Sequence, residues 1–145
     1  MPENMNIKRI IILSIFFSSI GCFPLFDYHR VNSDFAELKN FLNEVRFSAI
    51  QDGKSYIVRF EDRQTDLYTF NNEFIRSLPI STLSQVNYNT TLGDNMIVFR
   101  PGGTNEHNTR VHGGDIRLKS WFGFSKSIAV NCTGFVSEGV YPEDN

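Results

Sequence analysis

The chain has 145 residues, a formal net charge of −2 and 14 phenylalanines. This length suits a single globular domain. The near-neutral charge gives no electrostatic case for binding nucleic acid or an anionic membrane surface.

An uninterrupted apolar run extends from Ile10 to Phe26, and Lys8 and Arg9 precede it. As a helix this run would cover about 25 Å, the short end of a membrane span. The two basic residues would hold the N-terminal end in the cytoplasm. Pro24 would be tolerated near the end of such a span, where it would bend the helix. The pattern predicts a single-pass inner-membrane protein whose body is periplasmic.

Two other interpretations of the same run are open. A cleaved signal peptide also has a basic start and an apolar middle. Alternatively, the tetrapeptide from Ser19 to Cys22 resembles a lipobox, which makes Cys22 a candidate lipidation site. In every case residues 1–30 form a membrane anchor or signal segment, and residues 31–145 form the globular domain. The second cysteine, Cys132, is expected in a strand far from Cys22, so no disulfide is expected within the chain.

An amphipathic helix is predicted from Asp34 to Ile50. Asp34 and Glu37 have the spacing of a capping box, which places the start of this helix at Asp34. Gly53 is a natural C-terminal stop. Within the helix, apolar residues recur at spacings of three and four, which predicts one packing face made of Phe35, Leu38, Leu42, Val45 and Ala49.

Everything after Gly53 has the pattern of strands and turns. Strands are predicted over residues 56–60, 67–70, 86–88, 95–99, 116–121, 127–130 and 134–136. The first two are expected to form a hairpin with a longer loop over 62–65, while residues 74–78 are ambiguous and Pro79 would stop any helix there. The expected fold is α+β, with the helix packed on one antiparallel sheet of six or seven strands.

The order of these elements resembles a known family, the pseudopilins of type II secretion and the minor pilins of type IV pili, in particular the GspH/FimT group. Three stretches carry the resemblance: the helix end from Glu44 to Ile50, the strand from Ser55 to Phe60, and the C-terminal hairpin formed by 114–118 and 127–136. The resemblance implies a non-enzymatic, pilin-like subunit. It would assemble with other pilin-like subunits or secretion-machine proteins through its N-terminal helix and its sheet surface.

The chain departs from this family at the start of the apolar run. The family's processing motif, Gly-Phe-Thr-Leu-x-Glu, is replaced here by the sequence from Asn6 to Ile12, and no glutamate lies in the run. A carboxylate in lipid is costly and is therefore functional where it occurs. Its absence argues against normal prepilin-peptidase cleavage and ordinary filament incorporation. The runner-up function is a small periplasmic lipoprotein binding module lipidated at Cys22.

No pattern in the sequence indicates catalysis or a cofactor. The nucleophile elbow Gly-x-Ser-x-Gly is absent, and Gly102 and Gly103 lack the Lys-Ser/Thr of a phosphate loop. His107 and His112 lie in a polar stretch and are expected to be solvated, because a zinc site needs at least three well-placed ligands. The aromatic residues Trp121, Phe122 and Phe124 could form an exposed patch, although core packing is the favoured interpretation.

Overall fold

The computed structural model describes the backbone of residues 3–87, 89–90, 93–102, 105–106, 114–131 and 133–139, and the side chains of residues 22–86, 95–102, 114–131 and 133–139. Most of the predicted apolar span, residues 10–21, thus has no described side chains. Cys132, both loop histidines and residues 140–145 lie outside the described residues.

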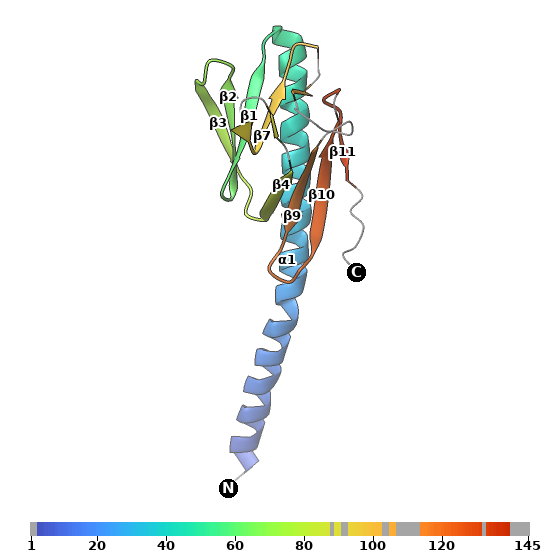
Figure 1. Cartoon of the computed structure of the whole chain (residues 1–145). Coiled ribbons are helices and arrows are strands. Elements are labelled where there is room, and N and C mark those ends of the chain that lie inside the picture. Colours follow the sequence, from blue (N-terminus) through green and yellow to red (C-terminus); the bar gives the residue numbers. More distant parts are fainter. Residues whose placement is uncertain are drawn as a thin grey trace.

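A single helix, α1, extends from Glu3 to Asp52 and passes through Pro24 without ending. In Figure 1 its N-terminal half projects beyond the sheets, and its C-terminal half packs against them. The predicted helix start at Asp34 is therefore wrong. Neither glycine nor proline lies between Phe26 and Asp34 to stop the helix. The buried face also begins one turn earlier, because Val31 is 1% exposed.

The first sheet is antiparallel and has the strand order β3-β2-β1-β7-β8. Its strands are β1 (Tyr56–Glu61), β2 (Gln64–Thr69), β3 (Phe74–Pro79), β7 (Met96–Phe99) and β8 (Asn105–Glu106). The hairpin predicted between the first two strands is confirmed, but its loop is shorter than expected. Glu61 pairs with Gln64, so only Asp62 and Arg63 connect the strands.

The second sheet has the order β11-β10-β9-β4 and is also antiparallel. It contains β4 (Leu83–Asn87), β9 (Gly114–Lys119), β10 (Ser125–Val130) and β11 (Val136–Glu138). A short pair, β5 (Asn89–Thr90) and β6 (Gly93–Asp94), accompanies the two sheets.

The expectation of one sheet is corrected, because β4 pairs with β9 and not with β3. The chain changes sheets at the turn from Ile80 to Thr82, where Ile80 donates its backbone N–H to the Arg63 carbonyl oxygen at 2.9 Å. The antiparallel α+β fold class is confirmed.

One hydrophobic core joins α1 to both sheets. Helix α1 contacts β7 of the first sheet and β9, β10 and β11 of the second. The largest fully buried side chains of this core include Leu38 and Leu42 of the helix, Phe99 of β7 and Ile128 of β10. The core therefore lies along the C-terminal half of α1, from Val31 onward.

Candidate assembly surface

The residues expected to pack the helix point into the core. Leu38, Leu42 and Ala49 are 0% exposed, and Val45 is 1% exposed. These side chains recur once per turn on a single face, as the helical period requires. The sheets cover this face, so any contact that α1 makes with another protein would use its opposite face.

The opposite face of α1 is exposed and ends in two large apolar side chains. Phe47 is 65% exposed and Ile50 is 48% exposed. A shallow groove lies along this face and is lined by Asn40, Asn43, Glu44, Arg46, Phe47 and Ile50. The groove contains a phenylalanine and an arginine, which are residue types enriched at protein interfaces.

Asp34 fastens the middle of α1 to the turn between the two sheets. Its Oδ2 accepts hydrogen bonds from the Ser81 hydroxyl at 2.9 Å, the Thr82 amide at 2.9 Å and the Thr82 hydroxyl at 2.8 Å. Arg30 adds a bond from Nε to Ser81 Oγ at 2.6 Å. The sequence pattern predicts Asp34 as the cap of its own helix. In the structure its carboxylate instead accepts hydrogen bonds from a distant turn.

The aromatic residues between β9 and β10 are exposed, which corrects the expectation that they pack in the core. Trp121 is 92% exposed, Phe122 is 53% exposed and Phe124 is 38% exposed. They lie in a tight connection in which Gly123, at φ +89°, takes the left-handed conformation that a three-residue hairpin loop requires. The loop extends past the strand ends, so its aromatic side chains remain largely open to solvent.

Asp27 ties this aromatic turn to α1. Its Oδ2 accepts the Phe122 backbone N–H at 2.8 Å. A hydrogen bond from the Ser120 hydroxyl and the backbone amides of Phe122 and Trp121 lower the pKa of the Asp27 carboxyl below its usual range. The carboxylate is thus ionised and supplied with donors by the turn itself. Nothing in the hydrophobic pattern indicated this role, although Asp27 is the first charged residue after the apolar run.

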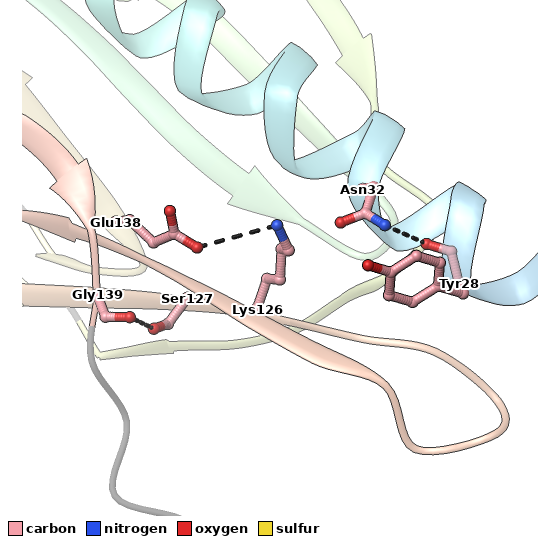
Figure 2. Close-up of polar contacts among 6 residues, drawn as sticks. All are labelled: Tyr28, Asn32, Lys126, Ser127, Glu138 and Gly139. Atoms are coloured by element: carbon pink, nitrogen blue, oxygen red, sulfur yellow. Dashed lines mark hydrogen bonds and ion pairs between the residues drawn. The ribbon is translucent and has the colours of Figure 1, made fainter.

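A ring contact holds the same hairpin from a second point. Tyr28 projects from α1 toward β9 and β10 (Figure 2), and its ring meets that of Phe124 edge to face with centroids 5.5 Å apart. Together with the Asp27 bonds, this contact fixes the position of the turn relative to the helix.

Polar contacts hold the far edge of the second sheet beside α1. Lys126 forms an ion pair with Glu138 at 3.9 Å (Figure 2), and its Nζ lies 4.6 Å from the centroid of the Phe35 ring. Ser127 donates its hydroxyl to the Gly139 carbonyl oxygen at 2.8 Å. A β-carbon at Gly139 would lie 2.5 Å from Ser127 Oγ, so a larger residue there would force the Ser127 hydroxyl to shift.

The candidate lipidation site and the metal and membrane expectations concern other parts of the described chain. Cys22 is exposed on α1 as a free thiol. Among the side chains that the structure describes, no three potential metal ligands lie together. In that same part of the chain, no helix has the length and apolar character needed to cross a membrane.

Two kinds of solved structure share this architecture. The type IV minor pilin FimU of Pseudomonas aeruginosa aligns with a TM-score of 0.56 at 10% identity, over 77% of this chain and 90% of that chain. The minor pseudopilin EpsH from the type II secretion system of Vibrio cholerae aligns with a TM-score of 0.57 at 8% identity, over 75% of this chain and 95% of that chain. No family model and no curated protein matches the sequence itself. The chain therefore has the fold of the minor pilins and minor pseudopilins, as its resemblance to the GspH/FimT group implied.

Proposed function

We propose that the chain is a non-enzymatic minor pseudopilin-like subunit of a type II secretion or type IV pilus machine. The observation that carries this proposal is α1, a single helix whose C-terminal half packs on antiparallel sheets while its N-terminal half projects beyond them (Figure 1). In the proposed arrangement the apolar run over residues 10–26 anchors the protein in the inner membrane. The sheets then face the periplasm.

Assembly would use the exposed face of α1. The buried face is occupied by the protein's own sheets, whereas the groove beside Phe47 is open. Phe47 and Ile50 supply apolar contact area there, and Glu44 and Arg46 supply charges that could select a partner. Glu44 already pairs with Arg76 of β3 at 2.6 Å, but both side chains are at least half exposed. This ion pair therefore leaves the groove accessible.

The test is site-specific photo-crosslinking in the source organism. A benzophenone amino acid replaces Phe47, and cross-linked products are identified by mass spectrometry. We expect products with another subunit that has an apolar N-terminal helix. The matched control places the probe at Phe70, which is 52% exposed but lies on the turn after β2. Equal cross-linking from both positions, or none from Phe47, would refute the use of this face.

Processing separates this proposal from the lipoprotein alternative. If the apolar run is an intact pilin-like helix, Cys22→Ser is expected to leave the mass and membrane location of the protein unchanged apart from the substitution. If Cys22 is a lipobox cysteine, the mature chain begins there with acyl chains that contribute about 0.8 kcal/mol of membrane affinity per buried CH₂. Intact mass spectrometry of the membrane fraction reads out the difference. A lipidated species starting at Cys22 would contradict the intact anchor and leave the fold unaffected.

A further inference from the structure

We propose that the membrane-side end of the body carries an aromatic platform that inserts into the lipid headgroup interface. The platform consists of Phe23 and Phe26 of α1 with Trp121 and Phe122 of the β9–β10 turn. This inference rests on the proposed membrane anchor and adds to it a contact made by the body, through Trp121 and Phe122 of the β9–β10 turn.

The four side chains share one exposed site although they come from distant parts of the chain. They line a single groove together with Asp27 and Arg30. Their exposed fractions are 60% for Phe23, 73% for Phe26, 92% for Trp121 and 53% for Phe122. Large aromatic side chains grouped in this way are costly to leave in water, and such patches mark surfaces that bind a partner or a membrane.

The position of the platform favours lipid as its occupant. Phe26 is the last residue of the apolar run, so the platform begins where the proposed span ends. Tryptophan is enriched at this level of membrane proteins because its ring is apolar and its indole N–H is polar. Arg30 lies one helical turn beyond Phe26, toward the body, where a cation would meet lipid phosphates.

Among the described residues that line the groove, Asp27 is the one carboxylate, and it is internally satisfied. Asp27 accepts the Phe122 amide and the Ser120 hydroxyl, so these donors already compensate its charge. The same bonds, with the Tyr28–Phe124 ring contact, hold the turn against α1. The platform is therefore formed before it meets the bilayer, and little conformational entropy is lost on insertion.

Trp121 is the single tryptophan of the chain, so its fluorescence reports the platform alone. The full chain is reconstituted into vesicles of phosphatidylethanolamine and phosphatidylglycerol, and flotation first tests whether it is anchored. Emission is then quenched either by lipids brominated near the headgroup or by iodide in the water. We expect strong quenching by the brominated lipids and severalfold weaker quenching by iodide than in free tryptophan amide.

The matched control moves the fluorophore to the other end of the body. The variant combines Trp121→Phe with Phe135→Trp, and Phe135 is also exposed, at 53%. Its ring packs near Arg46, roughly 28 Å along α1 from Asp27. In this variant iodide should quench efficiently, and the brominated lipids should have little effect.

Each alternative result has a defined meaning. If the chain does not float with the vesicles, both the proposed anchor and the platform are refuted. If the chain floats but iodide quenches Trp121 as freely as tryptophan amide, the platform is refuted and the anchor stands. If neither quencher reaches Trp121, the platform is covered by protein, which overturns the lipid contact in favour of a subunit interface.

Discussion

Replacing Asp34 with alanine is expected to destabilise the fold by roughly 2–4 kcal/mol. One buried carboxylate oxygen accepts three hydrogen bonds, from Ser81 and twice from Thr82. Thr82 is only 5% exposed, so its amide and hydroxyl cannot turn to water when the acceptor is removed. Most of the loss comes from these donors left without a partner, and because they share one acceptor their contributions are not additive.

Urea denaturation of the full chain in a non-ionic detergent measures this loss. Glu37→Ala is the matched control, since Glu37 lies on the same helix but is exposed, and its carboxylate accepts the exposed Ser33 hydroxyl at 3.1 Å. The control should change the free energy of unfolding by about 0.5 kcal/mol or less. Similar losses in the two variants would mean that Asp34 does not fasten the turn to α1.

Leu42→Ala is expected to cost roughly 2–5 kcal/mol, the range found for buried leucine truncations. Leu42 is 0% exposed and belongs to the core that joins α1 to both sheets, so the change removes apolar contacts and leaves a cavity. The same denaturation assay applies. Phe47→Ala removes a larger side chain from the opposite, exposed face and should cost about 1 kcal/mol or less.

The comparison of these two variants tests the assignment of the helix faces. A small loss for Leu42→Ala together with a large one for Phe47→Ala would reverse the assignment. In that case the groove beside Phe47 would be part of the folded core and could not serve as an assembly surface.

Local periodicity predicted the features that depend on near neighbours in the sequence. The helical stripe containing Leu38 and Leu42, and the strand from Tyr56 to Phe60, both follow from side-chain spacing alone. The division into two sheets could not be predicted in this way, because pairing β4 with β9 is a choice between distant strands. Side-chain spacing does not indicate which distant strand β4 pairs with.

The candidate surfaces were harder to predict, because a side chain's type does not reveal what covers it. Trp121 and Phe122 have the composition of a core segment, yet they project beyond the ends of β9 and β10. Asp34 has the residue type of a helix cap, but Val31 extends the buried face of α1 by one turn, so the helix starts earlier. In both cases tertiary position overrode a local preference.

The continuity of α1 has a mechanical consequence. At 1.5 Å per residue, its 50 residues make a rod about 75 Å long with no flexible joint between the projecting segment and the body. An axial displacement at one end of the helix would therefore be transmitted to the other end, because no slack linker lies between them to absorb it. Pro24 is the one residue of the described helix that cannot donate the backbone hydrogen bond of its turn. Under a sideways force the helix would therefore bend first at Pro24, at the level where the body meets the projecting segment.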